Sequence, residues 1–144
     1  MSGNAASLLR QASCVLIENR AILIEGPPGS GKSSLALALI DRGAILVGDD
    51  GVCLTPRAGK LWASPPPHTA GLLEIRNLGL VELPTGEGPA SLVLRLDRDA
   101  PRYIEQAGTI SIGGVDLPTL ALFPDTPALH LRAHWAVQKY AIRP

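Results

Sequence analysis

One stretch near the N-terminus constrains the fold more than any other. It reads GPPGSGKS and satisfies the phosphate-binding pattern G-x-x-x-x-G-K-[ST] in every fixed position. Residues 21–25 (AILIE) before it read as a short buried strand, and residues 33–42 (SSLALALIDR) after it read as a helix. In that setting backbone N–H groups and the positive helix end face phosphate oxygens. The pattern predicts a nucleotide site made of Gly26, Pro27, Pro28, Gly29, Ser30, Gly31, Lys32 and Ser33.

The last two residues of the loop have distinct chemical roles. Lys32 brings a mobile positive charge to the outer phosphates, and Ser33 brings a hydroxyl that a magnesium ion can bind. The alternative is a Gly/Pro-rich turn between a strand and a helix, but such a turn does not require a lysine and a serine at the helix start. We expect ATP and Mg²⁺ as the cofactors.

A pair of carboxylates follows the next predicted strand. Residues 44–48 (AILVG) read as that strand, and Asp49, Asp50 and Gly51 come directly after it. If the two strands run parallel, their carboxyl ends share one sheet edge, so both carboxylates face the bound phosphates. One would hold magnesium and the other would accept a proton. Asp-Gly between apolar runs is also a hairpin turn, and this alternative stays open.

The remaining pattern is rich in strands. We expect a hairpin that joins residues 11–18 to the strand before the loop, a second hairpin around residues 55–60, and a strand–bend–strand over residues 71–83 that carries Glu74 and Arg76 on one face as an ion pair. Two strands split at residues 116–118 precede a final helix that starts at Pro127. Ala128, Leu131 and Trp135 share one face of it.

Composition sets limits on the class of protein. The 144 residues suit a single domain over residues 1–144. The 13 basic and 13 acidic residues cancel, so no global field attracts nucleic acid. No apolar run reaches the roughly 18–20 residues of a membrane span, and the start lacks a secretory pattern, so we expect a cytoplasmic protein without a membrane segment. Cys14 and Cys53 lack partners at metal-ligand spacing, and we expect both to be reduced core residues.

Three segments together resemble a known family. GPPGSGKSS, RGAILVGDDGV and GLLEIRNLGLVEL are similar to the catalytic domain of HPr kinase/phosphorylase, in the short form that has only this domain. The resemblance spans about residues 11–122, and the acidic doublet with the EIRxLG segment is its most specific part. It implies an α/β fold: a phosphate-loop kinase domain with a sheet-rich core, related to phosphoenolpyruvate carboxykinase.

The resemblance also implies residue roles. Lys32 matches the loop lysine, Ser33 and Glu74 match metal-associated residues, and Asp49 with Asp50 match the doublet that supplies the base, with Asp50 also a metal candidate. Arg102, in PRYIEQAG, matches an arginine that stabilises charge. The mechanism implied is in-line transfer of the γ-phosphoryl group to a serine of the phosphocarrier HPr. The family is often hexameric, so a homo-oligomer is implied.

Some positions depart from the family pattern. Gln11 stands where the family has a histidine, Ser34 where an acidic residue follows the loop, and Asn77 where a glycine is expected. The glycine–arginine segment used in dephosphorylation is not visible in LPTLALFPDTPA. We therefore expect a kinase toward HPr with weak or absent phosphorylase activity. The alternatives are a catalytically degenerate nucleotide-binding regulatory module and a phosphate-loop kinase or NTPase with a different substrate.

Overall fold

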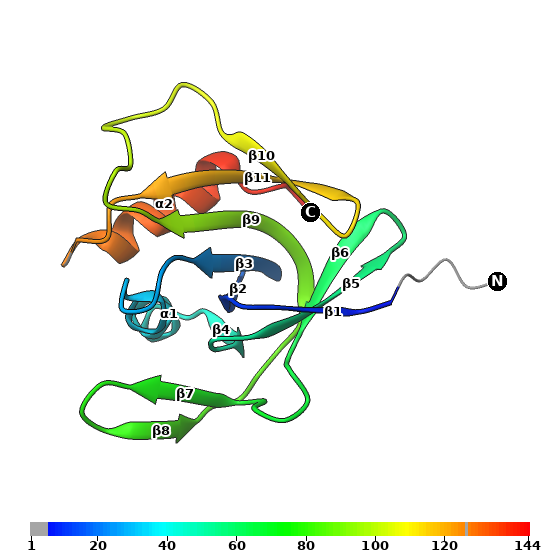
Figure 1. Cartoon of the computed structure of the whole chain (residues 1–144), viewed down its shortest axis with the longest axis vertical. Helices are drawn as coiled ribbons and strands as arrows, with labels where there is room; N and C mark the ends of the chain where they lie inside the picture. The colour runs from blue at the N-terminus through cyan, green and yellow to red at the C-terminus, as the bar shows by residue number, and fades with distance from the viewer. Residues whose placement is uncertain (1–5, 126) are drawn as a thin grey trace.

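The computed structural model describes residues 6–125 and 127–144. Figure 1 shows a large curved sheet, with a two-stranded sheet set apart from it at the lower edge. The elements within these ranges are β1 (Leu8–Arg10), β2 (Ser13–Ile17), β3 (Arg20–Glu25), α1 (Lys32–Asp41), β4 (Ile45–Gly48), β5 (Val52–Arg57), β6 (Lys60–Ser64), β7 (Leu72–Ile75), β8 (Gly79–Glu82), β9 (Gly88–Leu96), β10 (Gly108–Ile112), β11 (Val115–Leu122) and α2 (Leu129–Tyr140).

Strand β9 joins the two parts of the large sheet. Its first residues pair antiparallel with β6, and its later residues pair parallel with β3 on one side and β11 on the other. In Figure 1 β9 curves from the β5–β6 hairpin to lie between β3 and β11. The order β1-β5-β6-β9-β3-β2-β4 therefore places the phosphate-loop strand near the middle of the sheet.

The two faces of β3 pack into different cores. Ile22 and Ile24 face α1 and α2, where Leu35 and Val137 are also buried. Leu23 faces the opposite way, toward a core formed mainly by strands. Because both faces are covered, the strand is a continuous apolar run, as is usual for a strand buried on both sides.

The strand geometry ahead of the site is as predicted. β2 and β3 form the expected hairpin, and its turn residues Glu18 and Asn19 have φ of 54° and 63°. β2 pairs antiparallel with both β3 and β4, so β3 and β4 run in the same direction with one strand between them. Their carboxyl ends therefore lie at one edge, which confirms the prediction that brings the acidic doublet to the loop.

The hairpin-turn reading of the acidic doublet is wrong. β4 pairs with β2, whereas β5 pairs with β1 and β6, so the two strands on either side of the doublet are not partners. The chain instead leaves one part of the sheet after β4 and enters another at β5. Asp50 has φ of 57°, a left-handed conformation that aspartate tolerates better than most residues.

Two predictions near the C-terminus are corrected. The break between β10 and β11 is at Gly113 and Gly114, both with positive φ, and residues 116–118 instead pair with β10. The final helix begins at Leu129 and not at Pro127, and the face that carries Leu131 and Trp135 is exposed, with Trp135 69% and Leu131 42% accessible. The buried stripe is made by smaller residues at the same helical spacings: Leu129, Ala133, Ala136 and Val137.

Candidate nucleotide and phosphoryl-transfer site

The phosphate-binding loop lies between the end of β3 and the start of α1. Its backbone favours glycine for two reasons: Gly29 and Gly31 have φ of 79° and 102°, and a Cβ at Gly26 would lie 2.6 Å from the Ser30 hydroxyl oxygen and 3.1 Å from the Leu96 carbonyl. Side chains at these positions would strain the loop or push it from the sheet. The glycines of the motif therefore set the shape of the loop.

Lys32 folds back over this loop. Its Nζ donates to the carbonyl oxygens of Gly26 at 2.8 Å and Pro27 at 3.2 Å. The ammonium group is thus held beside the first residues of the loop, within reach of the volume that the loop encloses. This placement fits the expected role toward the outer phosphates.

Asp49 connects the loop helix to two other elements. Its Oδ1 accepts hydrogen bonds from the Ser33 hydroxyl at 2.7 Å and from the Ser13 hydroxyl at 2.9 Å. Its Oδ2 accepts one from the backbone N–H of Glu74 at 3.1 Å. The carboxylate therefore receives donors from α1, β2 and β7, and its position is fixed by three separate parts of the chain.

Asp50 and Glu74 present free carboxylates to the same region. Both side chains are exposed and line the cleft beside the loop. Within the described residues neither carboxylate takes part in an ion pair, and the one expected between Glu74 and Arg76 is wrong. Arg76 lines the cleft as well. The charges that the sequence pattern paired with each other are thus available to a ligand.

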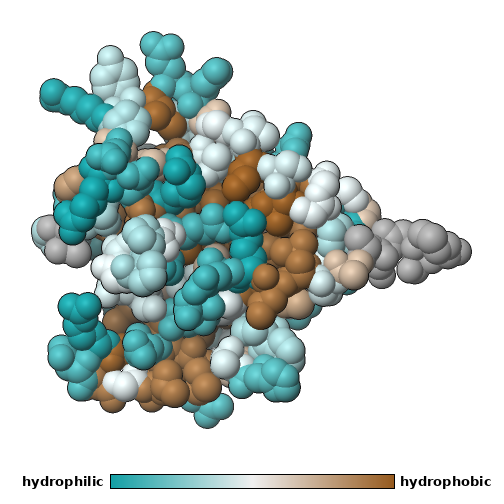
Figure 2. Space-filling view, viewed as in Figure 1, coloured by the Kyte–Doolittle hydropathy of each residue, from teal (hydrophilic) through white to brown (hydrophobic). Residues whose placement is uncertain are grey.

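A cleft of about 730 Å³ brings these groups together. The loop and the start of α1 form one wall, the acidic doublet lies beside them, and the β7–β8 hairpin forms the opposite wall. In Figure 2 apolar surface gathers at the lower edge of the molecule, where this hairpin lies, and its Leu78 and Leu80 are exposed. The lining includes Ser13, Gly31, Lys32, Ser33, Asp49, Asp50, Leu72, Glu74, Arg76, Leu80 and His130.

A second cleft, of about 530 Å³, lies against the other part of the loop. It is lined by the loop residues 26–30, by the end of β9 with Arg95, Asp97 and Arg98, and by Pro124. The sequence pattern did not single out these charged residues, because Arg95 belongs to an ordinary strand and Asp97 and Arg98 follow it. Only the parallel pairing of β9 with β3 brings them to the loop.

Three further positions were singled out by the resemblance: Arg102, Gln11 and Asn77. The structure places two of them outside both clefts. Arg102 lies exposed in the segment between β9 and β10 and lines neither cleft. Gln11 is also exposed and outside both linings, whereas Ser13, two residues later, reaches the doublet. Asn77 has φ of 76°, a left-handed conformation that asparagine tolerates better than most residues and that glycine adopts without strain.

The donor set fits magnesium of the kind found with nucleotides. No group of three or more His, Cys, Asp or Glu side chains converges on a metal-binding position in residues 6–125 and 127–144. Magnesium in phosphoryl-transfer sites needs only one or two protein ligands, because phosphates and water complete its octahedron. Ser33, Asp49 and Glu74 all line the cleft and carry oxygen atoms of that type.

Neither helix of the described chain is long and apolar enough to cross a membrane. Cys14 and Cys53 are both free thiols, but only Cys14 is a core residue, because Cys53 is partly exposed. Burial raises the pKa of the Cys14 thiol well above its ordinary value.

Comparison with known proteins agrees with this geometry. The HPr kinase/phosphorylase of Clostridium tetani is 47% identical over 72 residues, which cover 50% of this chain and 24% of the relative. That of Clostridium novyi is 39% identical over 85 residues, covering 59% and 28%. The chain thus matches about a quarter of the length of these curated relatives.

A solved structure extends the likeness to most of the chain. The HPr(Ser) kinase/phosphatase from Coxiella burnetii superposes with a TM-score of 0.81 at 26% identity, over 91% of this chain and 94% of that one. The expected sheet-rich α/β fold is confirmed. The model of the HPr Serine kinase C-terminal domain matches residues 5–93, which hold the loop, the acidic doublet and Glu74. The chain therefore belongs to the HPr Serine kinase C-terminal domain family.

Proposed function

We propose that this chain is an ATP-dependent protein-serine kinase that transfers the γ-phosphoryl group to HPr or a related phosphocarrier protein. The observation that carries the proposal is the convergence of Lys32 and Ser33 with Asp49 and Asp50 in one cleft. The acceptor is inferred from the names of the relatives, which contain HPr and, for the Coxiella burnetii protein, its serine.

The contacts support different roles for Asp49 and Asp50. Asp49 already accepts three hydrogen bonds, one of them from Ser33, so its charge is engaged and lies beside the metal-associated hydroxyl. Asp50 is exposed in the cleft and is the better proton acceptor. We assign magnesium binding to Asp49, Ser33 and Glu74, and not to Asp50. Magnesium, when bound, neutralises charge on the phosphates.

The reaction then follows from these positions. Asp50 takes the proton of the acceptor serine hydroxyl while that oxygen forms a bond to the γ-phosphorus. The bond from the γ-phosphorus to the bridging oxygen breaks, which leaves ADP and phosphoserine. Lys32 balances charge on the transferring group. Arg102 is proposed to add charge stabilisation after its loop moves toward the phosphates, so Arg102→Ala should lower turnover and leave nucleotide affinity unchanged.

The two clefts suggest how ATP lies across the loop. The carboxylates that serve the acceptor line the first cleft, so the nucleoside extends toward the second, where Arg95, Asp97 and Arg98 lie. Arg98→Ala should then weaken ATP binding several-fold and leave tripolyphosphate binding unchanged, because only the nucleoside contacts are lost. Lys32→Ala should weaken the binding of both. Equal loss of both ligands in Arg98→Ala would contradict this orientation.

Transfer to HPr is tested directly. The purified protein is incubated with γ-labelled ATP, Mg²⁺ and HPr, and the labelled residue is identified by mass spectrometry. Serine labelling that is lost in Lys32→Ala and in Asp50→Asn supports the proposal. Nucleotide binding without transfer to HPr or to water would favour the regulatory module, and transfer to water alone would favour an NTPase with another substrate.

Three further proposals concern the setting of the reaction. The segment LPTLALFPDTPA lacks the family's glycine–arginine motif, so incubation of phosphoserine-HPr with inorganic phosphate should release little or no pyrophosphate.

We propose a homo-oligomer, with the hexamer as the form that the resemblance suggests, and light scattering of the purified chain tests it. The proposed location is the cytoplasm, which fractionation of the native cells tests.

A further inference from the structure

Ser13 is the residue of this site that no sequence pattern marks. It is the first residue of β2, its side chain is fully buried, and its hydroxyl donates to Asp49 Oδ1 at 2.9 Å. The two residues are 36 positions apart in the chain. A buried hydroxyl needs a partner, and Ser13 finds it in the carboxylate that also contacts the phosphate loop.

The contact between Ser13 and Asp49 affects how the Ser33 hydroxyl is oriented. A serine hydroxyl has a single hydrogen and two lone pairs. Ser33 uses its hydrogen on Asp49 Oδ1, which leaves the lone pairs of its oxygen for a cation. That arrangement requires Oδ1 to stay where it is, and Ser13 is the second donor to the same oxygen.

We propose that Ser13 is a positioning residue for metal binding: it fixes Asp49 so that the Ser33 hydroxyl keeps its lone pairs turned toward Mg²⁺. Without Ser13, Oδ1 keeps only the donor from Ser33, and the remaining anchor of the carboxylate is the Glu74 N–H on Oδ2. Asp49 then has two donors instead of three, and only the Glu74 N–H holds it from outside the loop helix, so the carboxylate is oriented less firmly. Loss of a partner that orients a metal-site ligand typically weakens metal affinity by about 10–100-fold.

The inference rests on one part of the proposed function, namely that Mg²⁺ and a nucleotide bind at the loop. It does not depend on the phosphoryl acceptor. A purely structural role, in which Asp49 only satisfies the buried Ser13 hydroxyl, predicts a loss of stability without a change in the response to Mg²⁺. The two roles therefore differ in a binding measurement that involves no catalysis.

Ser91 offers a matched control. It is a serine on β9, 3% exposed, whose hydroxyl donates to the Pro89 carbonyl at 3.1 Å, and it lines neither cleft. Ser91→Ala removes the same group from the same sheet without touching Asp49. Ser13→Thr keeps a hydroxyl on a strand that accommodates β-branched residues, and Ser13→Cys replaces the hydroxyl by a weak donor.

The test is binding of a fluorescent ADP analogue to the whole chain over a series of Mg²⁺ concentrations, with thermal unfolding of each unliganded variant. In Ser13→Ala the Mg²⁺ concentration for half-maximal binding should rise about tenfold or more. It should stay within twofold of wild type in Ser91→Ala and Ser13→Thr. Nucleotide binding in excess EDTA should be the same in all of them.

The Ser13 inference and the kinase proposal fail under different results. An unchanged Mg²⁺ response in Ser13→Ala, with the stability loss of Ser91→Ala, overturns the inference. If Ser13→Ala does not fold, Ser13→Cys decides, since equal Mg²⁺ responses in the Ser, Thr and Cys forms would also overturn it. Wild-type binding without transfer to HPr would end the kinase proposal and leave the Ser13 result standing. No wild-type binding of the Mg²⁺–nucleotide at all would refute both.

Discussion

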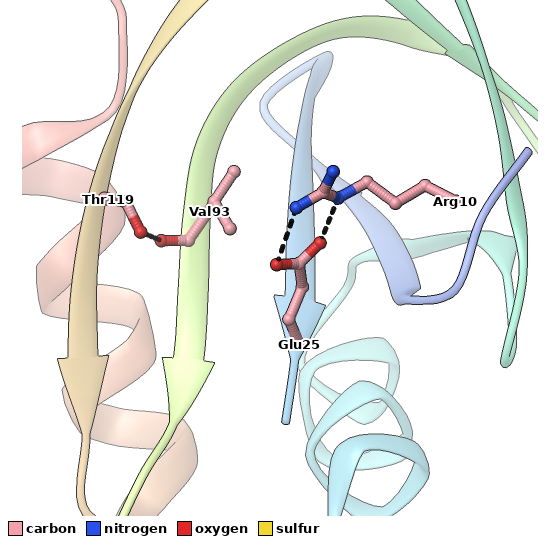
Figure 3. Close-up of polar contacts among 4 residues, drawn as sticks. All are labelled: Arg10, Glu25, Val93 and Thr119. Atoms are coloured by element: carbon pink, nitrogen blue, oxygen red, sulfur yellow. Dashed lines mark hydrogen bonds and ion pairs between the residues drawn. The ribbon is translucent and has the colours of Figure 1, made fainter. Parts of the chain in front are cut away.

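Arg10 and Glu25 form a two-point ion pair that ties the edge strand β1 to the residue immediately before the phosphate loop. Arg10 Nη2 donates to Glu25 Oε1 at 3.1 Å, and Arg10 Nε pairs with Oε2 (Figure 3). The hydrogen bonds that Arg10 donates to Glu25 raise the pKa of Arg10, since they favour the charged guanidinium. Figure 3 also shows the Thr119 hydroxyl bound to the Val93 carbonyl, which joins β11 to β9.

The ion pair should contribute measurably to stability, because its side chains are only 30% and 16% exposed. We expect Arg10→Met and Glu25→Gln each to lower the free energy of unfolding by roughly 1–2 kcal/mol, with a coupling of about 1 kcal/mol in the double mutant. Urea unfolding checks this. The more exposed pair Arg95–Asp97 is the control and should contribute less than about 0.5 kcal/mol. Equal values for the two pairs would contradict the expectation.

The two carboxylates of the doublet should respond differently to the same substitution. Asp50→Asn keeps a residue type that tolerates φ of 57°, so it removes mainly the base. We expect phosphoryl transfer to fall by about 10²–10⁴-fold with nucleotide affinity within about twofold of wild type. Asp49→Asn should instead raise the Mg²⁺ requirement. The measurements are initial rates and Mg²⁺ titrations, and a fully active Asp50→Asn protein would remove Asp50 as the base.

The bend of the β7–β8 hairpin should tolerate Asn77→Gly and resist Asn77→Val. At φ of 76° a glycine has no steric cost, whereas a β-branched residue is strained by roughly 1–3 kcal/mol. Hydrogen exchange of the hairpin amides, including the Glu74 N–H that contacts Asp49, reports the local stability. Faster exchange in Asn77→Val than in Asn77→Gly is expected. Equal exchange in the two variants would show that the left-handed conformation is not needed.

The two thiols should differ in reactivity. Burial raises the pKa of Cys14, so its thiolate is scarce near pH 8, whereas Cys53 is partly exposed. We expect one thiol to react with an aromatic disulfide reagent in the native protein and two in denaturant. In Cys53→Ala the native reaction should disappear. Two equally fast native thiols would contradict the burial of Cys14.

The same burial gives a pH dependence with a definite sign. The folded-state pKa of Cys14 lies above that of the unfolded chain, so the protonated thiol favours the folded state. This contribution is complete below about pH 8.5, the ordinary thiol value, and is lost as the pH rises toward the folded-state pKa. The melting temperature of wild type should therefore fall more steeply above that pH than the melting temperature of Cys14→Ala.

Much of the local structure could be predicted from the sequence. The loop is specified by glycines at positions of positive φ and by Lys32 and Ser33 at the helix start, all within one short segment. The hairpins on either side follow from alternating apolar runs with turn residues between them. Errors arose where two local patterns competed: Asp116–Leu117–Pro118 resembles a turn, but Gly113 and Gly114 make the tighter one.

The buried face of α2 is another feature that the local sequence pattern did not predict. Large apolar residues at helical spacing place Leu131 and Trp135 on one face, but that face is exposed and the stripe with Ala133 and Ala136 is buried. Small side chains let a helix lie close to a sheet, and periodicity alone does not state which of two stripes has a partner. Which face of a helix is buried depends on the elements that pack against it, and the sequence of the helix does not specify them.

By itself the sequence determined which residues form the phosphate loop and that an acidic doublet directly follows the next strand, because glycine conformation and strand periodicity are local properties. The shared sheet edge was only a conditional expectation, since it depends on β3 and β4 both pairing with β2. Only the tertiary structure decided which carboxylate contacts Ser33, that Ser13 shares that contact, and that Arg10 reaches Glu25. These pairs are far apart in the chain. They meet because β2 inserts between β3 and β4 and β1 lies across β5, and no short-range pattern encodes such pairing.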